Sequence, residues 1–435
     1  MLRKIKKLIL HPNRYFFDYL RKRHGFKKYF VTEIMRPYRE AEDRTWYKLF
    51  LSYPSFYLYD FYRKKLHKAE YPILIDYRIE TLADPFLGGG NRVVLAVELE
   101  GNNTVYFADA NFVLKVLSKQ EPYIAMTFLR IKFQGRGNKV FMGGMARLSR
   151  GTRITFVGSY NTLSLGMGTI IHPDVNITFK GANNALYLGK NCRILRETQL
   201  IFKRNGNCIY LGDNSNIHQI AEIQFYGNNA LIYAGGKSNV MSHIQIWSNS
   251  ILFSGFGTTL GNEKHHPITY KLQDQKNIII GSTTMITRGS YCRNSDGHLL
   301  YDAATNKRIS LSKSIIIGND AWIGQYSLIS KGSIIEDGAT VGANSVVSNK
   351  RIPARCIAAG NPARVLKQDV IIDRRYTGTF LDGDALKYDT YEPPDPEKEP
   401  TKIPFDKLIK IDEIDHNLCA KEKIKLIRNI LADLN

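Results

Sequence analysis

The sequence predicts a mainly-β protein built on a parallel β-helix, and two repeats support this fold class. A large aliphatic residue returns at every sixth position from Ile317 to Val347, and a phenylalanine returns at every 23rd position from Phe133 to Phe225. An α-helix repeats every ~3.6 residues and an ordinary strand every second residue, so neither explains these spacings. Repeats of this kind are typical of chains that stack successive turns along one axis.

The six-residue repeat indicates a triangular coil in which three short strands make one turn. Its aliphatic positions are Ile317, Ile323, Ile329, Ile335, Val341 and Val347. The residue two places earlier is small in all but the first case: Ala321, Ser327, Ser333, Ala339 and Ser345. We expect the aliphatic side chains to fill the prism and the small residues to let the chain bend at its corners.

The 23-residue repeat keeps four columns in one register. These columns are Phe133 to Phe225, Asn138 to Asn207, Val140 to Ile232 and Gly143 to Gly235. Each unit predicts a strand, a Gly/Asn corner, a strand, a Gly turn and a strand, which together make one longer coil. Asparagines stacked in a corner can bond their amides from coil to coil.

The sequence divides into four expected regions. Residues 1–28 form a basic amphipathic segment, 29–130 a mixed α/β region, 131–367 the β-helix, and 368–435 a Pro/acid-rich linker with a C-terminal helix. Within these regions we expect a helix in 44–68, strands at 71–77 and 93–99 around a glycine turn at 88–90, and a helix over 421–434. A polar excursion, 293–314, interrupts the coils.

The first region has ten Lys or Arg and a single acid, with aromatic residues between them. This composition suits an anionic membrane surface, although a solvated helix packed on its own domain has the same pattern. Its apolar run is too short for a signal peptide. No segment of the sequence reaches the ~20 apolar residues that span a bilayer.

The formal net charge of +21 points to a polyanionic partner: an acidic polysaccharide, a phosphorylated cofactor, an anionic membrane or nucleic acid. Charge alone does not choose among them. The five cysteines form no C-x-x-C pair, which favours a reduced, cytoplasmic setting. His172 and His218 share a coil phase but lie two coils apart, ~10 Å, too far for a shared zinc. We therefore expect no metal.

Residues 277–367 resemble the hexapeptide-repeat O-acetyltransferases that use acetyl-CoA, above all the branch that modifies sugars or polysaccharides. The matching motifs are Ser295-Asp296-Gly297-His298 with Tyr301-Asp302, Ile317-Gly318 with Trp322-Ile323-Gly324, Ala343-Asn344-Ser345-Val346-Val347, and Ala359-Gly360-Asn361-Pro362-Ala363-Arg364-Val365. Asn344 departs from the family, which usually has glycine there. The resemblance implies a left-handed β-helix and a homotrimer with active sites between neighbouring subunits.

The resemblance implies that His298 is the general base. Histidine suits this role because its usual pKa of ~6.5 lies near the working pH. Asp296 and Asp302 are the nearest carboxylates that can orient it. Asp302 is the marginal choice, and the sequence leaves open a plain turn role for it. The pair His265-His266 before Pro267 is a rival histidine site.

The resemblance also implies where acetyl-CoA binds. Trp322 lines the cleft or covers a subunit interface, and Gly324, Ala343 and Ser345 offer backbone contacts to the thiol arm. The phosphates are expected near the last coil. Their candidate cations are Lys350, Arg351, Arg364 and Lys367, which can equally be ordinary surface bases.

Three functions fit the sequence. The leading one is an acetyl-CoA-dependent O-acetyltransferase that acts by direct transfer on an anionic capsular polysaccharide. It is expected in the cytoplasm, with a peripheral contact to the inner membrane, and not on nucleic acid. The alternatives are a right-handed β-helix polysaccharide lyase or hydrolase, and a non-catalytic polysaccharide-binding scaffold.

Overall fold

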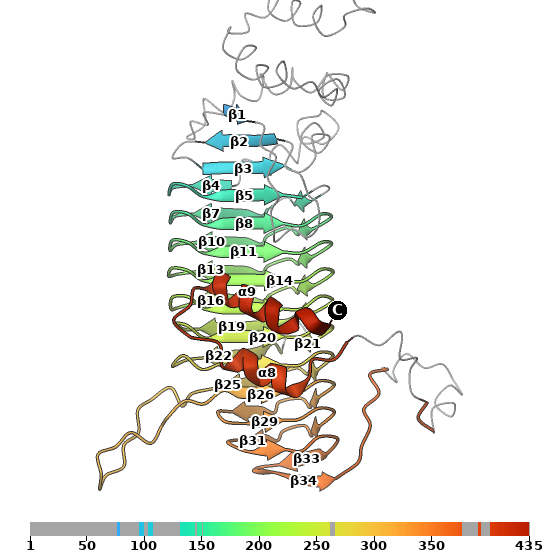
Figure 1. Cartoon of the computed structure of the whole chain (residues 1–435). Helices are drawn as coiled ribbons and strands as arrows, with labels where there is room; N and C mark the ends of the chain where they lie inside the picture. The colour runs from blue at the N-terminus through green and yellow to red at the C-terminus, as the bar shows by residue number, and fades with distance from the viewer. Residues whose placement is uncertain are drawn as a thin grey trace, which may run out of the picture.

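The chain folds as a parallel β-helix of three sheets, as the repeats predict (Figure 1). The computed structural model describes residues 76–78, 95–99, 103–107, 131–143, 146–149, 151–261, 266–375, 390–392 and 401–434. Sheet I faces the viewer in Figure 1, beneath the C-terminal helices. Its coil strands run to the right as the chain descends, which is the left-handed sense.

Each turn contributes one strand to each sheet. Sheet I contains β1 (Asp76–Arg78), β2 (Leu95–Leu99), β3 (Asn103–Phe107), β5 (Lys139–Met142), β8 (Thr162–Leu165), β11 (Ala185–Leu188), β14 (Cys208–Leu211), β17 (Leu231–Ala234), β20 (Ile251–Ser254), β23 (Ile278–Ile280), β26 (Ile315–Ile317), β29 (Ile334–Ile335) and β32 (Arg351–Ile352). Sheet II contains β4 (Ile131–Phe133), β7 (Arg153–Phe156), β10 (Asn176–Phe179), β13 (Gln199–Phe202), β16 (Glu222–Phe225), β19 (Ser242–Ile246), β22 (Ile268–Leu272), β25 (Tyr291–Arg293), β28 (Leu328–Ser330) and β31 (Val346–Val347). Sheet III contains β6 (Arg147–Leu148), β9 (Ile170–Ile171), β12 (Arg193–Ile194), β15 (Asn216–Ile217), β18 (Asn239–Val240), β21 (Thr259–Leu260), β24 (Met285–Ile286), β27 (Trp322–Ile323), β30 (Thr340–Val341), β33 (Ile357–Gly360) and β34 (Ala363–Lys367).

The pairing register follows the two sequence periods. In sheet II, Ile177 pairs with Ile154 on one side and Leu200 on the other, 23 residues away in each direction. The coil that contains the polar excursion is longer, because Asn277 and Ser314 meet across 37 residues. The next coil is a plain set of three hexads, since Ile316 pairs with Ile334.

The interior confirms the predicted columns. The rings of Phe133, Phe156, Phe179, Phe202 and Phe225 stack with centroids 4.6 to 5.0 Å apart. In the asparagine column, Asn161 Nδ2 donates to Asn138 Oδ1 at 3.0 Å, and Asn184 Nδ2 donates to Asn161 Oδ1 at 3.1 Å. The six hexad aliphatics from Ile317 to Val347 are all fully buried.

Two helices lie across the outer face of sheet I (Figure 1). The predicted C-terminal helix is confirmed as α9 (Ala420–Leu431), followed by the short 3-10 helix η5 (Ala432–Leu434). A second helix, α8 (Phe405–Asp412), was not predicted. It follows directly on the proline-rich stretch and buries only Leu408 and Ile411. Two buried positions are too few to reveal a helical repeat in the sequence.

Sheet I continues above residue 131, because β3 pairs in parallel with β5 and antiparallel with β2. β2 agrees with the strand expected at 93–99, and β1 overlaps the end of the one expected at 71–77. The basic segment 1–28, the helix in 44–68 and the turn at 88–90 lie outside the described residues. The four-region division stays a prediction. No helix in the described ranges is long and apolar enough to cross a membrane.

Candidate functional site

The polar excursion forms an arm, residues 293–314, which leaves the coil between β25 and β26 (Figure 1). Its two sides lie antiparallel: Tyr301 forms a bridge with Arg308, and Ile309 N donates to Leu300 O at 2.8 Å. The arm is rich in exposed apolar side chains. Those more than half exposed are Leu299, Leu300, Tyr301, Ile309 and Leu311.

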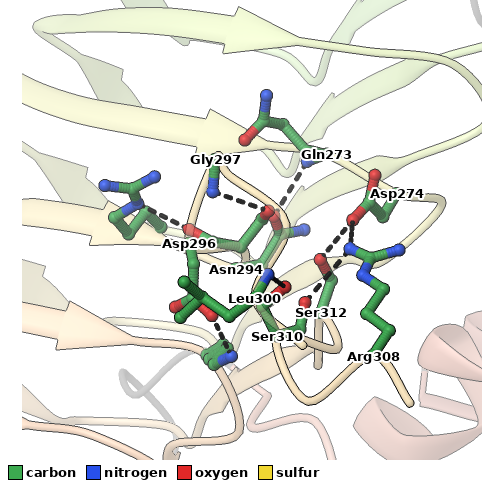
Figure 2. Close-up of polar contacts among 12 residues, drawn as sticks. Gln273, Asp274, Asn294, Asp296, Gly297, Leu300, Arg308, Ser310 and Ser312 are labelled. Carbon is green, nitrogen blue, oxygen red and sulfur yellow. Dashed lines mark hydrogen bonds and ion pairs between the residues drawn. The ribbon is translucent and has the colours of Figure 1, made fainter. Parts of the chain in front are cut away.

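The coil above the arm holds its root (Figure 2). Asn294 Oδ1 accepts a hydrogen bond from Gln273 N at 2.8 Å. Asp274 accepts from Arg308 Nη2 at 2.9 Å and from Ser312 Oγ at 2.7 Å. The Ser312 hydrogen bond, followed by the interaction with Arg308, lowers the pKa of the Asp274 carboxyl. Asp274 therefore stays ionised and ties down the returning side of the arm.

The coil below holds the outgoing side. Lys331 follows β28 and forms an ion pair with Asp296. Arg293 Nε donates to Ser295 O at 2.6 Å, and Gly297 N donates to Ser295 Oγ at 3.2 Å. Gly297 has a φ of 81°, which a side chain rarely adopts. The backbone just before His298 thus forms a turn that the contacts with Ser295 hold in place.

His298 itself is exposed. Its ring has no hydrogen-bond partner within the described ranges, so neither candidate aspartate orients it in the single chain. Asp296 is committed to Lys331. Asp302 accepts from Thr305 N and Thr305 Oγ1, both at 2.7 Å, and these bonds lower its pKa. Asp302 therefore has the turn role that the sequence left open, and orientation of His298 by either carboxylate stays a prediction.

The rival pair is only partly described, because His265 lies outside the described residues. His266 is exposed, and its ring meets Tyr326 edge-on with centroids 5.8 Å apart. Its carbonyl accepts from Gly289 N at 2.9 Å, which ties this stretch to the coil.

The residues expected near acetyl-CoA lie on sheet III and its corners. Trp322 points outward, 43% exposed, in register with Met285 and Thr340. A Cβ on Gly324 would lie 2.5 Å from Ala343 N, so this position needs glycine for the coils to stack. Ala343 is exposed, whereas Ser345 is buried and its hydroxyl accepts from Gly360 N at 3.0 Å. Its carbonyl accepts from Leu328 N at 2.9 Å, so the contact expected between Ser345 and the thiol arm stays a prediction.

Asn344, the departure from the family motif, has a φ of 55°. Asparagine tolerates this left-handed conformation better than most residues with a side chain. The corner consequently keeps its path without the usual glycine.

The four candidate cations differ in what they contact. Lys350 Nζ donates to Ala363 O at 2.6 Å, and Arg351 pairs with Glu336. Arg364 and Lys367 lie exposed on β34, with no ion pair to any described residue. These two are therefore the cations of the last coil that are best placed to meet a phosphate.

His172 and His218 follow β9 and β15, two coils apart as expected, with β12 between them. The described part of the chain contains no group of three or more His, Cys, Asp or Glu side chains that could hold a metal ion.

Three residues of the site were missed from the sequence: Asp274, Arg308 and Lys331. Lys331 was detectable, because it lies 37 residues after Asn294 and so occupies the same position one coil on. The Asp274–Arg308 contact has no such signal, because the arm does not follow the coil register.

Residues 314–349 match the family model described as bacterial transferase hexapeptide (six repeats). A polysialic acid O-acetyltransferase of Escherichia coli O1:K1 / APEC is 35% identical over 111 residues, 26% of this chain and 36% of that protein. A polysialic acid O-acetyltransferase of Neisseria meningitidis is 30% identical over 130 residues, 30% of this chain and 58% of that protein. The chain thus spans less than two thirds of either relative.

Among solved structures, the polySia-specific acetyltransferase NeuO is similar to this chain, with 25% sequence identity and a TM-score of 0.37. The similarity covers 55% of this chain and 97% of that one.

Proposed function

We propose that this chain, whose residues 314–349 have the hexapeptide repeats of bacterial transferases, is an acetyl-CoA-dependent O-acetyltransferase. The observation that best supports this is the placement of His298. It follows a fixed glycine turn on an arm that two neighbouring coils hold, through Asp274 above and Lys331 below. Such a histidine can reach an acceptor hydroxyl while its backbone stays in place.

In this reaction His298 acts as general base. It takes the proton of the acceptor hydroxyl while the hydroxyl oxygen attacks, and the protonated ring then gives that proton to the departing thiolate. Acetyl-CoA supplies the acetyl group as a thioester, whose carbon–sulfur bond breaks as the carbon–oxygen bond forms. No covalent bond to the protein is required when donor and acceptor bind together.

Sheet III and the last coil fit the donor. Trp322 and Ala343 are exposed and can contact the thiol arm. Arg364 and Lys367, which form no ion pair with a described residue, can bind the phosphates. Neither carboxylate of the arm contacts His298 in one chain. We therefore infer that the site is completed between subunits, in a homotrimer whose arms bury their exposed apolar side chains.

We propose an anionic cell-surface polysaccharide, such as a capsule, as the acceptor. Both relatives described above are named for O-acetylation of polysialic acid, and the net charge of +21 suits an acidic polymer. The proposed location is the cytoplasm, with the basic segment 1–28 at the anionic inner membrane.

The test replaces His298 with alanine and measures acetyl transfer to capsule fragments by mass spectrometry. Loss of a general base should reduce kcat by about 10²- to 10⁴-fold with an unchanged circular dichroism spectrum. His266→Ala tests the rival site, and His218→Ala, on a coil far from the arm, is the control. Full activity in His298→Ala together with a large loss in His266→Ala would move the base to the rival site. Polymer shortening without acetyl transfer would replace the proposed reaction with a hydrolase or lyase.

A further inference from the structure

Among the described residues, one aromatic stack stays partly exposed and lies outside the cover of the C-terminal helices. The phenylalanine column is buried inside the coil, and the outer stack of Tyr210, Tyr233 and Phe253 lies under the C-terminal helices, where Arg428 is 5.0 Å from the Tyr210 ring centre. The third stack, Tyr226 on Trp247, has centroids 4.8 Å apart and lies at the outer edge of sheet II. Neither ring belongs to the cluster beneath the helices, and both stay partly exposed.

Cations continue this stack along the same edge. The residues that follow β10, β13, β16 and β19 are Lys180, Lys203, Tyr226 and Trp247, each hydrogen-bonded through its backbone N to the next coil. Lys203 Nζ lies 3.8 Å from the centre of the Tyr226 ring.

In the next coil the position after β22 in this column is Gln273. Lys271 lies two residues earlier on the outward side of β22, in register with Gln245. It pairs in register with Arg293 on β25, and the cationic groups of both lie 6.0 Å from the Tyr291 ring centre. Arg293 is the first residue of the arm that holds His298. The outer face of sheet II therefore carries cations from this edge to the arm.

The positive charges on this side of sheet II have no acidic partner within the part of the chain that the structure describes. Lys180, Lys203, Lys271 and Arg293 make no ion pair with any described residue, and Glu222, on the outer face of β16, is hydrogen-bonded to Gln224. Cations that form no ion pair with a described residue attract an extended polymer that carries negative charge.

The length of the row favours a polymer over a single sugar or a nucleotide sugar. Five coil pairings separate Lys180 from Arg293, and at ~4.8 Å per coil they span about 24 Å. Nucleic acid fits less well, because binding of bases relies on free aromatic faces, whereas both faces of Tyr226 are occupied by Lys203 and Trp247.

We propose that these cations, from Lys180 at the edge of sheet II to Arg293 on its outer face, form a binding track for an extended anionic polysaccharide. It guides the chain to the arm, so the acceptor is the assembled polymer and not its precursor. This inference rests on the proposed acetyl transfer.

The test compares acceptor lengths. The probe is the capsular polysaccharide of the producing strain, de-O-acetylated and divided into short oligomers and long polymer. The track variant is Lys180→Gln with Lys203→Gln, which lies several coils from His298. The control variant is Arg193→Gln with Arg196→Gln on sheet III, which removes the same charge. Acetyl transfer gives kcat and KM, and fluorescence anisotropy of labelled polymer gives binding without turnover.

We expect the wild type to have a lower KM for long polymer than for oligomers. The track variant should raise KM and Kd for long polymer by roughly tenfold, leaving kcat and the oligomer KM unchanged. The control variant should change neither. The track would be overturned by an equal KM for both acceptor lengths, or by an equal loss of polymer binding in the track and control variants. It would also be overturned if duplex DNA at equal charge displaced the polymer. If the wild type transfers no acetyl group, the proposed function fails, and unchanged polymer binding by the track variant would then overturn the track as well.

Discussion

Single buried polar side chains hold the corners of this coil. In the asparagine column, each Oδ1 accepts the backbone N–H of the residue one coil on, as Asn184 Oδ1 does from Asn207 N at 2.9 Å. The column ends at Ala230, whose backbone N donates to Asn207 Oδ1, and Asn207 Nδ2 is buried without a hydrogen-bond partner among the described residues. Interior members of the column are therefore satisfied on both sides, and their removal leaves buried groups without partners.

Asn184→Ala should reduce the free energy of unfolding by about 1 to 3 kcal/mol, because the buried Asn207 N loses its acceptor, while Asn161 Oδ1 loses the side-chain donor and keeps only the backbone N of residue 184. Asn205→Ala is the matched control. Its amide oxygen accepts from Ala182 N at an exposed corner, where water can replace it. Urea unfolding measures both, and an equal loss in the two variants would contradict the role of burial.

The arm is the element on which the proposed chemistry depends. It is a long insertion in a repetitive coil, yet ion pairs to the coils above and below restrain it. Asp274 is the central residue on the upper side, since Arg308 and Ser312 both donate to the same carboxylate oxygen. Its contribution is present above the usual pKa of an aspartate and is lost as the pH falls through its lowered value.

Asp274→Ala should leave the coil stable but loosen the arm, which should reduce kcat for acetyl transfer by roughly 10- to 100-fold. Asp369→Ala, which removes an exposed partner of Arg355 in the last coil, serves as the control. Kinetics and thermal unfolding are measured on both variants. An unchanged kcat in Asp274→Ala would mean that the arm keeps His298 in place without this carboxylate.

At the scale of the whole molecule, the C-terminal helices brace many coils at once. Asn277 Nδ2 donates to Asp412 O at 3.0 Å, and Asn319 Nδ2 donates to Ile403 O at 2.7 Å. Lys423 is fully buried, and its Nζ donates to Asn229 O and Asn249 O, both at 2.9 Å. Burial lowers the pKa of this lysine from 10.5 to about 8.

This lysine predicts a pH dependence of stability. Between about pH 8 and 10.5 the unfolded chain holds the Lys423 proton more tightly than the folded one, so this group makes stability rise with pH in that window. The neutral amine still donates to both carbonyls. Lys423→Met should therefore flatten the rise, and Lys425→Met, exposed on the same helix, should not. Urea midpoints measured across the window test this, and identical pH profiles for wild type and Lys423→Met would refute it.

The sequence by itself determined the coil. Ile317 to Val347, the phenylalanines and the asparagines each repeat at the period of one turn, and inward-facing positions of a stacked coil see only the same position one turn away. Local periodicity is therefore enough to place these side chains in the core. The arm was also visible, as the stretch where that periodicity stops.

Only the tertiary structure decided which partners the polar residues of the site chose. The coil register places Lys331 one coil after Asn294, but it does not indicate that the partner of Lys331 is Asp296, 35 residues away. Asp302 bonds to Thr305 in its own turn, and Asp274 reaches Arg308 across a coil of irregular length. An insertion breaks the register that relates one coil to the next. Contacts at the arm therefore depend on its path in space, which no repeat in the sequence describes.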